Sequence, residues 1–170
     1  MIPTRKEVLA FTRKVRKYLD TTVYAALVAE GRTITRVDTK SYLKNNDFIN
    51  CWGTSVDGRK FSIWEKASTV LDYGYFELEH TDSRGLKVPG MGMRSKANVL
   101  VYVLWNADYN RVEQVYYLNV AAMKKRAVEA LAADNNIMII NGEGSFKVKT
   151  WKFNFKDLDS TCFVTFNPIK

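Results

Sequence analysis

The run Val-Leu-Val-Tyr-Val-Leu at residues 99–104 constrains the fold of this chain more than any other segment. Side chains of a β-strand alternate between the two faces of a sheet, and here both faces are apolar. A strand of this kind must be covered above and below, so the run predicts a central strand between packed layers. With the patterns described next, it predicts an α/β fold: a mixed central β-sheet flanked by helices.

Two segments have the spacing of amphipathic helices. Residues 4–7 have the form of a capping box, and apolar residues recur at helical spacing from Val8 to Val28. This predicts one long helix that stops at Gly31 and is broken near residues 20–22. Asn119 is suited to cap a second helix, with apolar residues on one face from Val120 to Leu131.

The remaining patterns predict strands. Asp57-Gly58 is a two-residue hairpin signal between segments rich in aromatic and β-branched residues. Further strands are expected at residues 48–52, 73–80, 112–118, 137–140, 146–155 and 162–166. The alternation slips inside 146–155, which predicts a β-bulge near Thr150.

Composition narrows the class of partner. A chain of 170 residues fits one domain, residues 1–170. The net charge of +8 favours a polyanionic partner, nucleic acid before a membrane. Two cysteines and one histidine argue against a zinc site and against a serine or cysteine hydrolase. The charged N-terminus shows no signal peptide, and no apolar run reaches membrane-spanning length, so we expect a cytoplasmic protein.

The stretch 57–104 resembles the PD-(D/E)xK, or restriction-endonuclease-like, nucleases, and most of all small phage-encoded members. The pieces that carry the resemblance are Lys66-Ala67, residues 73–79, Pro89-Gly90-Met91 and residues 95–98. The resemblance implies a restriction-endonuclease-like core and a magnesium-dependent endonuclease that hydrolyses DNA. For a phage-encoded protein, the compartment would be the host cytoplasm.

The predicted site centres on the strand at residues 73–80. Regular alternation would place Glu77 and Glu79 on one face, where two carboxylates need a metal or neighbouring Lys/Arg side chains between them. The resemblance implies catalytic roles for Glu77, Glu79 and Lys66, and Mg²⁺ held by Asp57, Glu77 and Glu79. Asp72 and Glu65 are alternative ligands to Asp57, whose place before Gly58 also suits a turn.

Two groups of cations are candidates for phosphate contact. The first helix carries Arg13, Lys14 and Lys17 on its outer face, together with Arg5, Lys6 and Arg16. The loop 81–96 carries Arg84, Lys87, Arg94 and Lys96 among glycines, which allow another chain to approach closely. The alternatives are a solvated helix face and a mobile connection between strands.

Two departures from the family pattern keep a second function open. Trp64 and Asn98 stand where the family carries acids. The alternative is therefore an inactive nuclease-like domain that binds nucleic acid, or a host or phage protein, without cleavage. A pure protein-interaction module such as an inhibitor, and a homodimer, are further alternatives.

Overall fold

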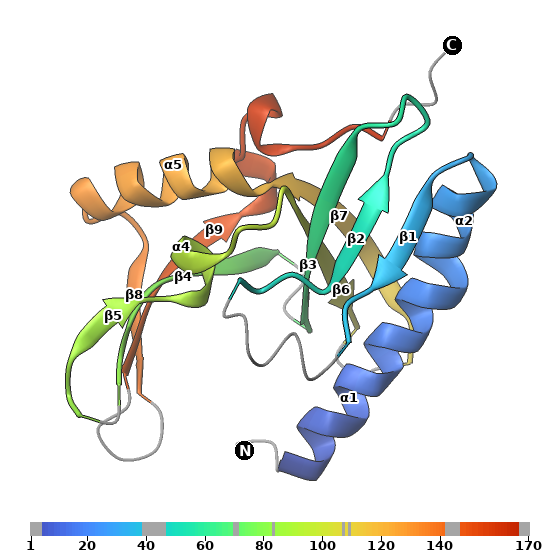
Figure 1. Ribbon diagram of the computed structural model, residues 1–170. Helices are drawn as coiled ribbons and strands as arrows, with labels where there is room; N and C mark the ends of the chain where they lie inside the picture. Colours follow the sequence, from blue (N-terminus) through green and yellow to red (C-terminus); the bar gives the residue numbers. More distant parts are fainter. Residues whose placement is uncertain are drawn as a thin grey trace.

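The computed structural model describes residues 5–38, 47–69, 72–82, 84–106, 108, 110–141 and 147–166. In these parts of the chain, two β-sheets and three helices longer than one turn build the fold (Figure 1). The strands of the first sheet are β1 (Thr33–Arg36), β2 (Cys51–Thr54), β3 (Lys60–Ser68), β6 (Val99–Trp105) and β7 (Val112–Asn119). Those of the second are β4 (Tyr73–Thr81), β5 (Lys87–Pro89), β8 (Ile137–Asn141) and β9 (Lys147–Asn154).

The first sheet has the order β1-β2-β3-β6-β7 and is mixed. Strands β3 and β6 pair in parallel, and every other pair is antiparallel. All seven residues of β6 are buried, as its apolar sequence predicts for a central strand. The hairpin at Asp57-Gly58 joins β2 to β3, and Gly58 has a φ of +83°, which a side chain would strain.

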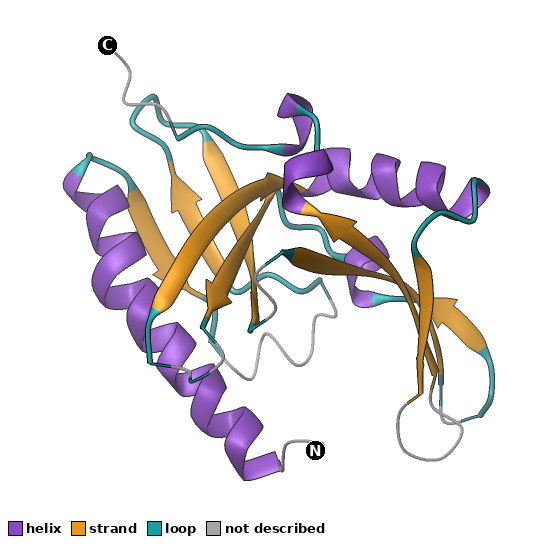
Figure 2. Cartoon of the chain, turned by 180° about the vertical axis from the view of Figure 1, so that it is seen from behind, coloured by secondary structure: helices purple, strands orange, loops and turns teal. Residues whose placement is uncertain are grey.

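A continuous helical segment covers one face of this sheet (Figure 2). It consists of α1 (Arg5–Tyr18), a π-helical turn η1 (Leu19–Val23) and α2 (Tyr24–Ala29). Its apolar stripe includes Val15, Leu19 and Leu27, which pack with Ile63 and Val101 of the sheet. The predicted break near residues 20–22 is instead this π-helical turn, and Gly31 follows the helix with a φ of +90° as expected. Thr4 of the predicted capping box lies outside the described residues.

The second sheet and α5 (Val120–Ala132) cover the opposite face. This sheet is antiparallel with the order β5-β4-β9-β8. Asn119 caps α5, since its side chain accepts a hydrogen bond from the Ala122 backbone N–H at 3.1 Å, as the sequence predicts. The layer between the sheets is aromatic: the ring of Tyr102 lies edge-on to Phe155 at a centroid distance of 5.3 Å.

The mixed α/β class is confirmed, but one expectation about the sheet is wrong. The strands form two sheets rather than one central sheet, because β4 follows β3 in the chain but pairs with β9 in a second sheet. The expected edge strand at 162–166 is reduced to a 3₁₀ turn η3 (Ser160–Cys162) and a single bridge from Phe163 to Leu118. The remaining one-turn elements are α4 (Met91–Arg94) and the 3₁₀ turn η2 (Phe155–Asp157).

Candidate functional site

Two of the three predicted catalytic side chains, one from β3 and one from β4, come together. The ammonium Nζ of Lys66 lies 3.9 Å from Oε1 of Glu77 and donates a hydrogen bond to the Tyr75 carbonyl at 2.8 Å. Their side chains are only 20% and 17% exposed. Burial lowers the pKa of Lys66 below its ordinary 10.5, and the nearby Glu77 carboxylate offsets part of this shift.

The third, Glu79, lies on the other face of the sheet. In the ladder between β4 and β9, Glu77 is opposite Thr150 and Glu79 is opposite Lys149, so Leu78 is an extra residue. Thr150 and Lys149 are neighbours and point to opposite faces, and their partners do the same. The prediction that the two glutamates share a face is therefore wrong. The irregularity expected near Thr150 is present, but its extra residue belongs to β4.

The carboxylate of Asp57 is engaged inside its own turn. It accepts hydrogen bonds from Ser55 and from Nε of Arg59, the latter at 2.6 Å. The Ser55 hydroxyl, followed by the Arg59 groups, lowers the pKa of Asp57 below its ordinary value. Lys60 begins β3 just after this turn, and Lys66 is six residues further along, about 20 Å at the rise of a strand.

The carboxylates proposed for Mg²⁺ therefore do not converge. Asp57 lies at one end of β3, Glu77 near the other, and Glu79 faces away. No group of three His, Cys, Asp or Glu side chains suited to a metal occurs among the described residues. Glu65, an alternative ligand, lies on the helix-covered face. This donor set does not fit a magnesium ion, which needs oxygen ligands in octahedral arrangement.

Glu65 instead holds the helix to the sheet. Its carboxylate accepts hydrogen bonds from the Tyr24 hydroxyl at 2.6 Å and from Nη1 of Arg36 at 2.9 Å, and the Cys51 thiol approaches at 3.5 Å. Arg36 also binds Asp20 in the π-helical turn at 2.7 Å. Burial alone would lower the pKa of Arg36, but its hydrogen bonds to both carboxylates raise it above the ordinary value. The cluster joins residues more than forty positions apart and has no local sequence signal.

The cations of the loop between β4 and β6 have partners within the protein. Three of them pair with carboxylates: Arg84 with Asp82 at 2.8 Å, Lys87 with Glu79 at 3.9 Å, and Lys96 with Asp47 at 3.0 Å. Arg94 lies over the ring of Phe48 at 5.0 Å. The loop glycines also serve the protein itself, because a Cβ on Gly92 would lie 2.7 Å from the Glu77 carbonyl oxygen.

The cations of α1 from Lys6 to Lys17, in contrast to those of the loop, lie on an exposed helix face. Lys6, Arg13, Arg16 and Lys17 are exposed, and no carboxylate of the described residues forms an ion pair with them. Lys14 lies over the ring of Trp105 at 5.3 Å. At 100° per residue, Lys6, Arg13 and Lys17 form one row opposite the buried stripe, about 16 Å long. We call this row the α1 cation row.

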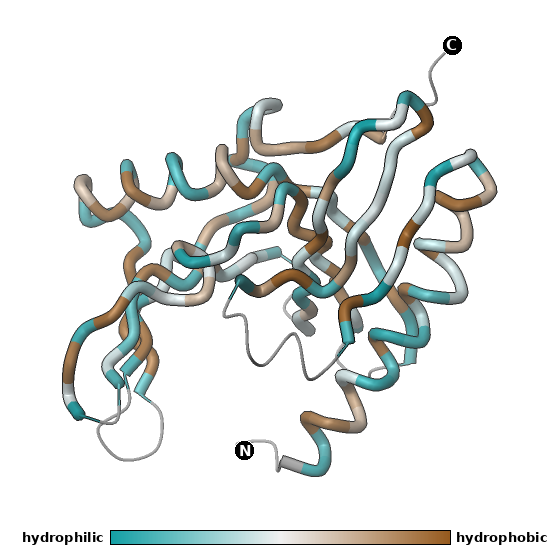
Figure 3. The backbone as a smooth tube through the Cα atoms, viewed as in Figure 1, coloured by the Kyte–Doolittle hydropathy of each residue, from teal (hydrophilic) through white to brown (hydrophobic). Residues whose placement is uncertain are grey.

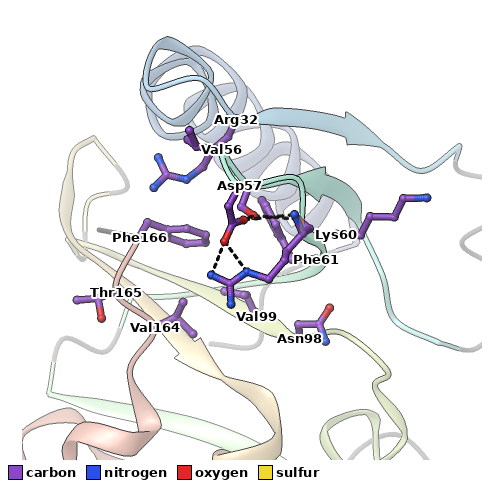
Figure 4. A pocket seen from close by; sticks show the side chains of 12 residues that line it. Arg32, Val56, Asp57, Lys60, Phe61, Asn98, Val99, Val164, Thr165 and Phe166 are labelled. Carbon is purple, nitrogen blue, oxygen red and sulfur yellow. Dashed lines mark hydrogen bonds and ion pairs between the residues drawn. The ribbon is translucent and has the colours of Figure 1, made fainter. Parts of the chain in front are cut away.

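A pocket of about 320 Å³ lies between the β2–β3 turn and the segment after η3 (Figure 4). Phe61, Val99, Val164 and Phe166 contribute apolar surface, and Asn98 and Asp57 contribute polar groups. Its arginines are already engaged: Arg59 by Asp57 at 2.6 Å, and Arg32 by Glu30 and by the ring of Phe166. The pocket therefore offers less free positive charge than the α1 cation row.

Comparison of the chain with protein-family models, curated proteins and solved structures found no match. Among the described residues, no helix has both the length and the apolar character needed to cross a membrane.

Proposed function

We propose that this protein binds nucleic acid, DNA in the first place, through the α1 cation row and without magnesium-dependent cleavage. The observation that carries the proposal is the contrast between the two groups of cations. Lys6, Arg13 and Lys17 have no carboxylate partner among the described residues, whereas the loop cations largely neutralise the protein's own acids. A row about 16 Å long spans several phosphates of one nucleic-acid strand, and each contact releases condensed counterions.

We favour nucleic-acid binding without cleavage over a magnesium-dependent nuclease. The contact between Lys66 and Glu77 is the one feature that favours hydrolysis, but Asp57 and Glu79 lie too far away or face the wrong side to complete a metal site. A restriction-endonuclease-like core remains part of the proposal, supported by the mixed sheet with α1 on one face. A phage origin and a cytoplasmic location in the host are proposed with it.

The test is the salt dependence of DNA binding by two charge-matched triple variants. In Lys6→Ala/Arg13→Ala/Lys17→Ala, we expect the negative slope of the log of the DNA-binding constant against log salt concentration to become shallower by about 3. In Arg84→Ala/Lys87→Ala/Lys96→Ala, which loses the same charge from cations with internal partners, we expect the slope to stay near that of the wild type. Equal losses in both would show attraction to net charge alone, and a loss only in the second would place binding at the loop.

A cleavage assay decides between binding and hydrolysis. We expect DNA incubated with the protein and Mg²⁺ or Mn²⁺ to remain intact. Cleavage that disappears in Glu77→Ala and persists in Arg59→Ala would overturn the non-cleaving proposal and restore the nuclease.

A further inference from the structure

The outermost strand of the second sheet is apolar and uncovered. β8 is last in the order β5-β4-β9-β8, and its sequence is Ile-Met-Ile-Ile-Asn. Met138, Ile139 and Ile140 are 40%, 62% and 46% exposed, although alternate side chains point to opposite faces. In Figure 1 the strand runs out along an arm away from α1, and Figure 3 shows hydrophobic residues continuing along that arm. Edge strands of monomers are ordinarily protected by charges, prolines or bulges, none of which lies within β8.

The backbone of β8 has its free groups at alternate residues. The carbonyl of Asn136, just before the strand, accepts a hydrogen bond from the N–H of Lys152 at 2.9 Å, so this carbonyl points toward β9. Antiparallel ladders alternate, so Met138 and Ile140 also direct their N–H and C=O groups toward β9. Ile137, Ile139 and Asn141 therefore direct theirs outward, where the sheet has no further strand among the described residues.

We propose that two copies of this chain associate by antiparallel pairing of β8 with β8, about a two-fold axis at Ile139. In this register Ile139 faces Ile139 of the second copy, Met138 faces Ile140, and Ile137 faces Asn141. The three outward-directed residues of each strand meet the three of the other as hydrogen-bonded pairs. The four-stranded sheets then join into one of eight strands.

Charge and symmetry favour a second copy as the occupant of this edge. β8 carries no charged side chain in a chain with a net charge of +8, so it is a segment along which two such chains can meet without direct repulsion. The nearest lysines on the Ile139 face, Lys149 of each copy, would be three strand spacings apart, about 14 Å and beyond the screening length at physiological salt. The three large apolar residues are also centred on the proposed axis.

The size of the contact sets the expected strength. One short strand and three exposed side chains bury less than the roughly 800 Å² per partner of a standard interface. The dimer should therefore be weak and depend on concentration. The proposal is independent of nucleic-acid binding.

Sedimentation equilibrium of the protein without nucleic acid tests the proposal. The wild-type mass should rise from 19.5 kDa toward twice that value with increasing concentration. Ile139→Lys and Ile139→Glu each place like charges opposite one another at the axis, and each should weaken self-association at least about tenfold. Mixing the two variants places opposite charges there and should restore a dimer that contains one copy of each.

Leu86→Lys is the matched control, because Leu86 is a 54% exposed leucine in the turn at the other edge of the sheet. It should associate like the wild type. A wild-type protein that remains monomeric at the highest attainable concentration would overturn the proposal without reference to any variant. So would folded Ile139 variants that dimerise like the wild type, or that do not pair when mixed.

Discussion

Glu65 and Lys66 are adjacent on β3, yet their side chains lie on opposite faces of the sheet in contrasting environments. Glu65 is enclosed by donors from the helix and two other strands: Tyr24, Arg36 and Cys51. Lys66 has one backbone carbonyl at 2.8 Å and one carboxylate at 3.9 Å. A buried charge stabilises a fold only when its hydrogen-bonding capacity is met. Glu65 therefore anchors the helix, whereas Lys66 retains part of its desolvation cost.

The largest effect expected from this contrast concerns the Cys51 thiol. Burial, followed by the Glu65 carboxylate, raises the pKa of Cys51 from its ordinary 9.0 to about 12. At pH 8 its thiolate should be about a thousandfold rarer than that of an ordinary cysteine. We expect iodoacetamide labelling of Cys51, followed by peptide mass spectrometry, to be correspondingly slow in the folded protein and rapid in urea. Labelling of the folded protein at the unfolded rate would show that the network is open.

The next largest effect is on stability. Glu65→Leu removes the shared acceptor and leaves Tyr24 and Arg36 without it, which should lower the free energy of unfolding by about 3 kcal/mol. Urea denaturation followed by circular dichroism measures the change. Arg59→Ala, at a side chain 85% exposed, is the control and should change stability by less than about 0.5 kcal/mol. A similar small loss for Glu65→Leu would contradict the anchoring role.

Replacing Lys66 should raise the stability of the protein, whereas replacing Glu65 should lower it. The pKa of Lys66 in the folded protein is lowered below the 10.5 of the unfolded chain. Between the folded pKa and 10.5, the unfolded chain binds more protons than the folded protein, so the contribution of Lys66 to stability rises with pH. Lys66→Met removes this contribution. We expect the variant to be more stable than the wild type at pH 7, on the order of 1 kcal/mol, by an amount that shrinks as the pH approaches 10.5.

Chemical denaturation at several pH values measures this difference. Lys87→Met, at a side chain 76% exposed, should show no such trend. A Lys66→Met variant that is less stable than the wild type at pH 7 would mean that the contact with Glu77 outweighs desolvation.

The smallest effect should come from Glu79, the partner of Lys87. Their side chains are 37% and 76% exposed and their charged atoms lie 3.9 Å apart, so this surface pair contributes little. We expect Glu79→Ala to change the unfolding free energy by no more than about 0.5 kcal/mol. Urea denaturation of the variant and the wild type at low and at high salt measures this change. A loss comparable to that of Glu65→Leu would contradict the exposed, weakly coupled state of the pair between Glu79 and Lys87.

The sequence by itself determined the features that depend on neighbouring residues. The apolar run of β6 required burial on both faces, Asp57-Gly58 specified the hairpin, and Asn119 capped α5. Alternation along β3 also placed Glu65 and Lys66 on opposite faces, because no bulge interrupts that strand between them. These properties arise within a few residues and leave a local pattern.

Only the tertiary structure decided which charges meet. The bulge at Leu78 turned Glu79 away from Glu77, a one-residue change that alternation within β4 does not reveal. The helix and β1 delivered Tyr24 and Arg36 to Glu65 across long separations. Likewise, the loop cations found carboxylates while the α1 cation row did not. Whether a charge is neutralised depends on side chains brought within a few ångströms by folding, and spacing along the chain does not encode that distance.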